Sequence, residues 1–565
     1  MFIIKYYILG ALISLLAAIY IPQIMVSLLF LWVSLSLALV SVAYVFDIPS
    51  IFRKNQDGKI IRWIRWAFIP FLLGARAYNA WERRRDTVPP IQKVSDNLYL
   101  SRRLFQSDLD FLESNDISCI VDVTAEFAGL ESAMTDKQFH YLSIPVLDHK
   151  APTLERLRHA INWIDTQISC SRAVVVHCAL GRGRSVFVVA AYLLSKDPSL
   201  TVESVMKKIN DVRSTARLNK LQIKTLRAIS EKGVLGLDQS TWMVVNPVAG
   251  GGKWEENEQH LIRELTKKYR LSIHQTTTDL SAEQITLQAK ESGAKQIIVA
   301  GGDGTVTEVA SQLVGTDIKL GIVPLGTANA LCHVLYGVGA KFSPVEKACE
   351  ALLAGHCQRI DTAECNQRLI LLVLGIGLEQ KMIEHAQREE KNTFGQLAYL
   401  TGFFNAVVAE ETQTLTVAMD APFEDENREN GSQTLEVHSF VVANIAPFST
   451  LLAQGGGAPQ PDDGKLHITY LDNTESLGGR LIALSDLTLT SVGAQEESTH
   501  FQYATAQNVT ISANKPIEYV IDGELYSDEQ LAIKLRPKSL NVFVPSGRSK
   551  SADKQWIMRD LPSAL

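Results

Sequence analysis

The sequence predicts a multidomain α/β protein: an N-terminal transmembrane helical hairpin, two successive α/β domains, and a mainly β domain at the C-terminal end. The chain has 565 residues, several times the length of a usual single domain. Two long apolar stretches open it, and short β-rich runs then alternate with helical patterns, which is typical of a parallel sheet covered by helices. With 46% hydrophobic and 21% charged residues, the chain has the composition of a folded protein and not of a disordered one.

The apolar stretches cover residues 2–21 and 24–46, and each is close to the roughly 20 residues that span a bilayer core. Pro22 and Gln23 separate them and can close a tight turn. The alternative is a cleaved signal peptide, but its apolar region would be shorter and no second apolar stretch would follow. Because Lys and Arg are dense after residue 50, the positive-inside rule predicts a multi-pass inner-membrane anchor over residues 1–46, with the catalytic domains in the cytoplasm.

Charge is unevenly distributed along the chain. Residues 52–85 carry nine Lys and Arg against two acidic residues, a net charge of +7, whereas the whole chain carries −6. An acidic body argues against nucleic-acid binding. Residues 60–85 mix Trp, aliphatic residues and Arg, so we expect an interfacial helix within a basic juxtamembrane segment, 47–90; a third short span is the alternative. The seven cysteines lack any C-x-x-C pair, which argues against a disulfide framework or zinc site and indicates a reducing compartment.

Three domains are expected after the juxtamembrane segment, followed by a tail at 547–565. The first, at 91–230, has strands at Ile117–Val123, Tyr141–Val146 and Ala173–His177 and helices at Thr153–Ile168, Ser185–Ser195 and Thr201–Arg213. The second, at 241–360, has strands at Trp242–Val245, Ser272–His274, Gln296–Val299 and Leu320–Val323 and helices at Glu255–Tyr269, Ser281–Ser292 and Val306–Leu313. The third, at 361–546, has strands at Leu415–Met419, Leu435–Asn444, Leu466–Leu471, Asn508–Ser512, Ile517–Ile521 and Ser539–Val544, with an acidic loop at Ala421–Thr434.

A cysteine stands between the strand at Ala173–His177 and the next helix, in the segment HCALGRGRS at 177–185. A loop of this kind points backbone N–H groups inward and adds the helix dipole, so an anion such as phosphate fits there. The same field lowers the pKa of the Cys178 thiol, which predicts a nucleophilic thiolate. Gly181 and Gly183 permit the tight loop.

Four other side chains complete this first constellation. Arg184 can grip two phosphate oxygens, and Ser185 can hydrogen-bond the sulfur. Asp148, in the loop after the strand at Tyr141–Val146, is the candidate general acid for the leaving oxygen. His177 orients the loop. The alternative is an inert buried cysteine beside a basic turn, with Asp148 an ordinary turn residue.

The H-C-x5-R-S element resembles the cysteine-dependent protein tyrosine phosphatases, most closely the dual-specificity group, over residues 91–230. The resemblance implies a phosphocysteine intermediate at Cys178, phosphate binding by Ala179–Arg184, and Asp148 as acid and then base. Arg182 departs from the group's pattern, in which small or polar residues are common, and a more basic loop would suit a doubly charged, phosphoinositide-like headgroup. Both lipid and phosphoprotein substrates are compatible with the motif.

Three glycine-rich turns follow three strands of the second series, at Asn246–Lys253, Ala300–Glu308 and Pro324–Asn329. The carboxyl ends of strands in one such sheet share an edge, where α/β proteins bind ligands. Glycine lets the backbone approach phosphates closely, and Asp303 would engage Mg²⁺-bound phosphate or the acceptor hydroxyl. The alternative is three ordinary turns.

These turns resemble the catalytic domain of diacylglycerol kinases, shared with sphingosine kinases and bacterial lipid kinases. The motifs P-D-D-G-K-L at 461–466 and D-G-E at 522–524 add to the resemblance. It implies an α/β nucleotide domain and a β-sandwich with a cleft between them, ATP and Mg²⁺ as cofactors, Glu524 as general base, and a structural Mg²⁺ held by Asp463 and backbone oxygens near Gln460 and Lys465. The cofactor-binding residues expected for this site are Asn246, Thr277, Gly301, Gly302, Gly304, Thr305, Thr307, Gly326 and Thr327. Glu379 stands where the family usually has Asp.

Together the two constellations predict a membrane-bound bifunctional enzyme. Its kinase would phosphorylate a diacylglycerol-like or sphingoid-like lipid alcohol, and its phosphatase would hydrolyse a lipid or protein phosphomonoester, so the expected partners are membrane lipids, ATP and phosphoproteins. One alternative is a kinase for a soluble metabolite, because NAD kinases and phosphofructokinases also carry G-G-D-G-T. Another is a regulatory module that binds phosphate groups without turnover.

Overall fold

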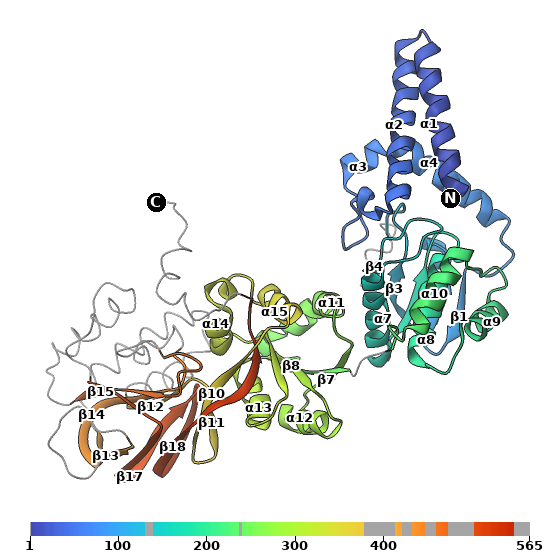
Figure 1. Cartoon of the computed structure of the whole chain (residues 1–565). Coiled ribbons are helices and arrows are strands. Elements are labelled where there is room, and N and C mark those ends of the chain that lie inside the picture. Colours follow the sequence, from blue (N-terminus) through green and yellow to red (C-terminus); the bar gives the residue numbers. More distant parts are fainter. Residues whose placement is uncertain are drawn as a thin grey trace. The chain divides into compact units, whose positions relative to one another are not determined.

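The computed structural model describes residues 2–129, 139–236, 240–377, 413–420, 432–446, 459–472 and 502–546. The chain divides into two compact units, the first made of Met1–Ser240 with Gln259–Ile273 and the second of Thr241–Glu258 with His274–Leu565 (Figure 1). Glu379, most of the expected acidic loop and the tail at 547–565 lie outside the described residues.

The two apolar stretches form helices α1 (Phe2–Tyr20) and α2 (Ile24–Phe46), which pack on each other (Figure 1). The Ser34 hydroxyl donates a hydrogen bond of 2.8 Å to the Ala11 carbonyl. Among the described residues, α2 is the one helix long and apolar enough to cross a membrane, and the apolar part of α1, Ile4–Tyr20, is shorter. By length and composition, therefore, one helix is a candidate membrane span, whereas the sequence predicted two.

The expected interfacial helix at 60–85 is two helices, α3 (Arg62–Ala67) and α4 (Ile69–Arg84), preceded by the 3-10 helix η1 (Pro49–Phe52). Pro70 lies in the first turn of α4, where its missing N–H costs no hydrogen bond, so a new helix begins there. A cluster of buried apolar side chains joins these helices to the domain that follows them: it contains Phe52, Phe68 and Phe71 together with Ala125 and Leu147.

The domain that follows has a five-stranded sheet in the order β1-β2-β5-β3-β4. Its strands are β1 (Ile91–Ser95), β2 (Leu98–Ser101), β3 (Ile117–Asp122), β4 (His140–Ser143) and β5 (Ala173–His177), and its helices are η2 (Gln106–Asp108), α5 (Leu109–Ser114), α7 (Leu154–Ser169), α8 (Arg184–Lys196), α9 (Val202–Val212) and α10 (Lys220–Glu231). All strand pairs are parallel except β1 with β2. Every residue of β5 is buried, as a central parallel strand covered on both faces requires.

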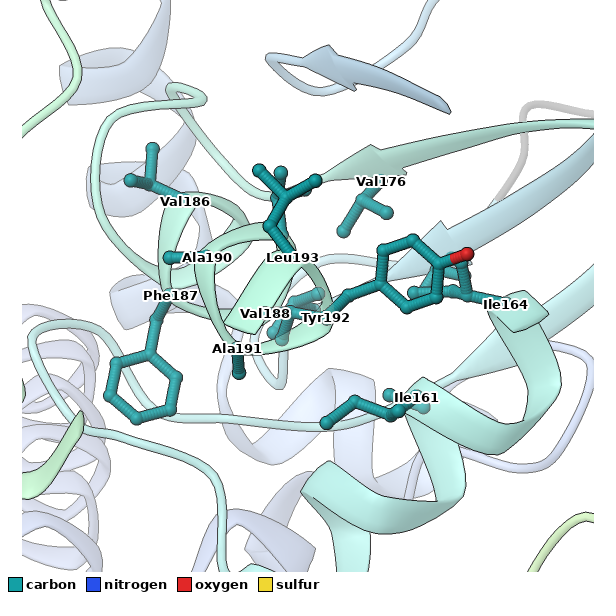
Figure 2. Close-up of a cluster of buried hydrophobic side chains, with 14 of the residues drawn as sticks. Ile161, Ile164, Val176, Val186, Phe187, Val188, Ala190, Ala191, Tyr192 and Leu193 are labelled. Atoms are coloured by element: carbon teal, nitrogen blue, oxygen red, sulfur yellow. The ribbon is translucent and has the colours of Figure 1, made fainter. Parts of the chain in front are cut away.

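Helix α8 supplies much of the core of this domain. Figure 2 shows its side chains, from Val186 to Leu193, packed with Val176 of β5 and with Ile161 and Ile164 of α7. Because α8 begins directly after the cysteine loop, its burial fixes the loop's downstream end on a rigid element.

A buried ion pair ties the segment before α3 to this sheet. Lys54 Nζ lies 2.5 Å from the Asp122 carboxylate at the end of β3, and both side chains are 1% exposed. Asp122 also accepts hydrogen bonds from the Tyr141 hydroxyl (2.8 Å) and from the Thr124 amide (2.9 Å). Burial alone would raise the pKa of Asp122, but Lys54, with smaller help from His177, holds it well below its usual range.

We expect Lys54→Met to destabilise the sheet by about 3 kcal/mol, because it leaves a buried carboxylate without its cation. Amide exchange of β3 should then accelerate about a hundredfold, as measured by hydrogen exchange and mass spectrometry. Lys59→Met, at an exposed position of the same turn, is the matched control and should leave exchange unchanged. Unchanged protection of β3 in Lys54→Met would show that the pair contributes nothing.

The chain after residue 240 begins as an α/β arrangement with β6 (Thr241–Val245), β8 (Gln296–Gly301) and β9 (Lys319–Pro324) as parallel neighbours. The other elements of this region are η3 (Ala249–Gly251), α11 (Lys253–Leu265), β7 (Leu271–Gln275), α12 (Ala282–Glu291), α13 (Asp303–Leu313), α14 (Ala330–Tyr336), η4 (Val338–Lys341) and α15 (Pro344–Ala354). The mixed α/β class predicted from the sequence is therefore confirmed.

The strands after residue 356 differ from the expectation in three ways. They are β10 (Cys357–Cys365), β11 (Arg368–Ile370), β12 (Val373–Gly377), β13 (Gln413–Met419), β14 (Ser432–Ala443), β15 (Leu466–Asp472), β16 (Gln502–Ala506), β17 (Asn508–Ile521) and β18 (Glu524–Phe543). The two strands expected at 508–521 are one strand, β17, with an irregularity between Ser512 and Ile517. The strand expected at 539–544 is the end of the 20-residue β18, and residues 432–434 of the expected loop belong to β14.

Strand β18 also joins the two regions that were expected to be separate. It pairs antiparallel with β17 and β10, and its last residues pair parallel with β9, Asn541 opposite Lys319. The strands consequently form one connected 13-stranded sheet in the described part of the chain, where the sequence predicted a nucleotide domain and a distinct β-sandwich.

Candidate active sites

The loop at 178–183 encloses a buried thiol. Cys178 is 3% exposed, and its sulfur accepts hydrogen bonds of 3.3 Å from the Gly181 amide and from the Ser185 hydroxyl. Both donors point at the sulfur, so the loop closes around the Cys178 side chain. Gly181 has φ +68°, and a Cβ there would lie 2.7 Å from the Ser101 carbonyl oxygen, so this position needs glycine.

Arg213, which the sequence analysis missed, holds the loop from outside. This buried side chain donates to the Gly181 carbonyl (2.8 Å) and to the Leu180 carbonyl (3.3 Å). Because a trans peptide places its C=O and N–H on opposite sides, carbonyls held outward turn the following N–H groups inward. The loop thus presents an amide cradle that suits an oxyanion.

Arg184 lies at the start of α8 and is buried. It makes two hydrogen bonds to Glu126 (2.7 and 2.8 Å) and one to the Val146 carbonyl (2.8 Å). Burial would lower the pKa of Arg184, but Glu126 and then Asp148 raise it well above the usual value, so the guanidinium stays charged. Glu126 was also missed, since a single acidic residue in a loop carries no pattern in the sequence.

The structure brings the candidate acid to this cluster. The Asp148 carboxylate is 3.3 Å from the Arg184 guanidinium, and its side chain is 40% exposed. A carboxyl that contacts both solvent and Arg184 is placed to exchange protons with a group bound in the loop. His177 is buried, and burial lowers its pKa, so a neutral ring is expected at pH 7, in line with an orienting role.

Arg182 differs from the expectation of a loop with spare positive charge. Its guanidinium pairs with Glu82 of α4 at 2.7 Å and lies 3.7 Å from the Asp86 carboxylate. A side chain already neutralised by two carboxylates has little charge left for a second phosphate. The inference of a doubly charged headgroup therefore loses its basis.

The second candidate site lies where β6, β8 and β9 end side by side. The Asn246 amide donates to the Thr305 hydroxyl (3.0 Å), and Lys253 Nζ donates to the Gly326 carbonyl (2.9 Å), so all three glycine-rich turns are in contact. A Cβ at Gly326 would lie 2.6 Å from Gly302 Cα. Glycine is needed here because two backbones pass at van der Waals distance.

Asp303 begins α13 and joins two of these turns. Its carboxylate accepts hydrogen bonds from the backbone N–H groups of Asn329, Ala330 and Leu331, at the start of α14. Burial raises the pKa of Asp303, and these hydrogen bonds oppose the rise. The structure therefore gives Asp303 a bridging contact in addition to any contact with phosphate.

The predicted threonines occupy different surroundings. Thr305 is buried against the Asn246 amide, Thr307 is partly buried in the first turns of α13, and Thr327 is exposed. Thr277 is exposed as well, and its hydroxyl accepts the Leu280 amide at 3.1 Å within its own turn. Thr305 and Thr307 thus share the helix start with Gly301, Gly302 and Gly304, whereas Thr277 is engaged in a local turn.

Glu524 follows a two-residue hairpin turn between β17 and β18. Asp522 (φ 48°) and Gly523 (φ 98°) have the left-handed backbone that such a turn requires. The Glu524 carboxylate lies 3.8 Å from the position that a Cβ of Gly304 would occupy. The tight turn therefore places the candidate base beside the start of α13. The Tyr526 hydroxyl donates to Glu524 at 2.7 Å and orients it.

Asp522 anchors that hairpin. Its carboxylate accepts the amides of Leu371 (2.8 Å), Leu372 (3.0 Å) and Val373 (2.9 Å). Burial raises the pKa of Asp522 to about 6, against the effect of these hydrogen bonds. The first residue of D-G-E is thus a structural clamp, which explains why the motif needs Asp at this position.

Asp463 lies in an acidic turn beside a pocket of about 700 Å³ whose acidic lining is Asp361, Asp420, Asp462 and Asp463. Its carboxylate accepts the amides of Gln460 (3.1 Å) and Lys465 (3.0 Å) and contacts His467 (2.8 Å). Within the described ranges, no group of three His, Cys, Asp or Glu side chains is placed to hold a metal ion. Asp463 supplies a hard carboxylate oxygen of the kind that Mg²⁺ takes, and water would supply most of the other ligands.

The geometry defines two classes of site in one chain: a cysteine in an amide cradle with an arginine and an acid, and glycine-lined strand ends facing a carboxylate. Comparison with known families identifies the same two classes of site. Residues 98–232 match the dual specificity phosphatase catalytic domain, and residues 240–365 match the diacylglycerol kinase catalytic domain. The chain therefore carries two catalytic domains, a dual-specificity phosphatase domain followed by a diacylglycerol kinase domain.

Individual relatives each match a part of the chain. An uncharacterised protein of Synechocystis is 30% identical over 353 residues, 59% of this chain and 78% of the relative. The diacylglycerol kinase of Bacillus subtilis is 31% identical over 166 residues, 28% of this chain and 52% of the relative. A solved diacylglycerol kinase structure from Bacillus anthracis aligns with 54% of this chain and 97% of its own, at 22% identity and a TM-score of 0.42.

Proposed function

We propose that the protein is a membrane-bound bifunctional enzyme. Its kinase transfers the γ-phosphate of ATP to a diacylglycerol-like or sphingoid-like alcohol, and its phosphatase hydrolyses a phosphomonoester of a lipid or protein. The observation that carries the kinase activity is the position of Glu524 beside the glycine-rich start of α13. The family matches support the same assignment.

In the kinase, the Glu524 carboxylate takes the proton of the lipid hydroxyl while that oxygen attacks the γ-phosphorus. The bond from phosphorus to the bridging oxygen breaks, and ADP leaves with the electron pair. The residues proposed to hold ATP are the backbone amides of Gly301–Thr307 and of the Gly326 turn. Mg²⁺ bound by Asp463 and the backbone oxygens of Gln460 and Lys465 would stabilise the acidic turn.

In the phosphatase, the Cys178 thiolate attacks phosphorus and forms a phosphocysteine, while Asp148 donates a proton to the departing alcohol oxygen. Asp148 then takes a proton from water, the water oxygen attacks the phosphocysteine, and phosphate and the thiolate are released. Arg184 and the inward amides of the loop hold the non-bridging oxygens through both steps. Ser185 stabilises the sulfur as it leaves.

The proposed location is the inner membrane, with α1 and α2 as a helical hairpin and the catalytic domains in the cytoplasm. The apolar α2 and the nine basic residues at 52–85 support this. An acceptor lipid is met only at the bilayer surface, so an anchored kinase has ready access to it.

The experiment that tests the kinase is incorporation of radiolabel from ATP into a mixed lipid extract. We expect Asp303→Asn to reduce labelling about a hundredfold, because both the phosphate contact and the bridge to α14 are weakened. Hydrolysis of p-nitrophenyl phosphate by the same sample is the internal control and should be unchanged. Equal labelling of lipid by both proteins would refute the kinase assignment at this residue.

A further inference from the structure

Helix α4 touches the cysteine loop directly, although it lies outside the region that matches the phosphatase family. Asn79 is 4% exposed, and its side-chain amide donates to the Ala179 carbonyl at 3.0 Å. One turn later, Glu82 accepts a hydrogen bond of 2.7 Å from Arg182. Residues three apart lie on one face of a helix, so α4 turns a polar face to this loop.

The two contacts fall on the loop's outer side. Ala179 is the first residue after the cysteine, and its carbonyl also accepts the Arg103 amide at 3.2 Å. The Arg182 carbonyl accepts the Arg217 amide at 2.8 Å. With the Arg213 bonds to Leu180 and Gly181, every carbonyl from 179 to 182 is held outward.

Outward carbonyls point the N–H groups of residues 180–183 into the cradle. The Asn79 bond therefore helps to orient the peptide that supplies the Leu180 amide. The Glu82 bond holds the Arg182 side chain away from the cradle. Asp86, which follows α4, lies between two guanidinium groups: its carboxylate is 3.7 Å from that of Arg182 and 3.9 Å from that of Arg213. Cradle geometry thus depends on a segment that precedes the first strand of the sheet.

We propose that Asn79 and Glu82 are positioning residues of the phosphatase, so that α4 is an integral part of its oxyanion site. The proposal rests on the phosphatase assignment above and deepens it. The side of α4 away from Asn79 and Glu82 carries exposed Leu73 and Trp81 among arginines, so the helix that positions the cradle also presents a face suited to a bilayer surface.

The test uses the full-length chain and two readouts: calorimetric affinity for tungstate, an oxyanion that needs no turnover, and hydrolysis of p-nitrophenyl phosphate. We expect Glu82→Gln and Asn79→Leu each to weaken tungstate binding and raise KM about tenfold, because misplaced amides bind the oxyanion poorly. A merely structural role would lower the active fraction, and hence kcat, without changing KM or tungstate affinity.

Two further variants test whether Glu82 acts through Arg182 and whether the effect is specific to α4. Because Glu82 acts through Arg182, the double variant Glu82→Gln with Arg182→Gln should be no weaker than either single variant. Glu155→Gln, at an exposed site in the first turn of α7, is the matched control and should behave as the wild type.

The inference would be overturned if both α4 variants bound tungstate as tightly as the wild type does. Wild-type protein that binds tungstate in a Glu82-dependent way without hydrolysing p-nitrophenyl phosphate would refute the phosphatase activity and leave the inference standing. Wild-type protein that does not bind tungstate would overturn both.

Discussion

Replacing Cys178 by serine should abolish phosphomonoester hydrolysis, with a fall in kcat of at least about a thousandfold. Serine keeps the side-chain volume and both hydrogen-bond partners, the Gly181 amide and the Ser185 hydroxyl, so the loop should keep its shape. What disappears is the nucleophile, because a hydroxyl in the same cradle stays protonated near neutral pH. The measurement is vanadate-sensitive hydrolysis of p-nitrophenyl phosphate by the full-length chain.

Two controls isolate the effect. Cys357→Ser changes an exposed cysteine of the second unit and should leave hydrolysis unchanged. Lipid phosphorylation by Cys178→Ser should equal that of the wild type, because the three glycine-rich turns and Glu524 lie in the other unit. Hydrolysis that persists in Cys178→Ser would show that another group is the nucleophile.

The second large effect is expected for Glu524→Gln, which should lower lipid phosphorylation by about a hundred to ten thousandfold, the range of a general base. Glutamine keeps an oxygen that can accept the Tyr526 hydroxyl, so the side chain stays in place. It cannot take the proton of the attacking alcohol. The measurement is the initial rate of radiolabel transfer from ATP to diacylglycerol and to sphingoid bases in vesicles.

The matched control for this variant is Glu529→Gln, on the same strand β18 and also exposed. The two positions are five residues apart, an odd number, so their side chains point to opposite faces of the sheet. Glu529→Gln should be as active as the wild type. A Glu524→Gln rate within threefold of the wild type would exclude Glu524 as the base.

Both proposed activities depend on elements that are short in sequence and strict in backbone geometry. The loop at 177–185 can be recognised because a cysteine, a glycine with positive φ and an arginine at a helix start occupy one continuous segment. The Asp-Gly pair before Glu524 is similarly local, since two left-handed residues make the hairpin turn. Local requirements of this kind restrict the residue types, so a pattern in the sequence can reveal them.

Errors in the predicted fold arose where local pattern carries little information. The irregularity after Ser512 interrupts the alternation of buried and exposed residues, so β17 seemed to be two strands. Only the end of the long β18 was predicted, for a related reason: charged residues such as Asp528, Lys534 and Arg536 lie on its exposed side, and its pairing with β10, β17 and β9 holds it in one strand.

The amino-acid sequence by itself determined the class of protein and the two loop regions proposed to bind phosphate, because glycine, cysteine and helix-start requirements act over a few neighbouring positions. Only the tertiary structure decided which distant side chains serve those backbones. Glu126 on Arg184, Arg213 behind the loop, Asn79 and Glu82 on α4, and Asp522 on the β11–β12 turn each act across a long stretch of chain. The role of a single polar residue can be recognised only when folding buries it beside its partner. The reason is that an unpaired buried charge costs free energy only in the folded state.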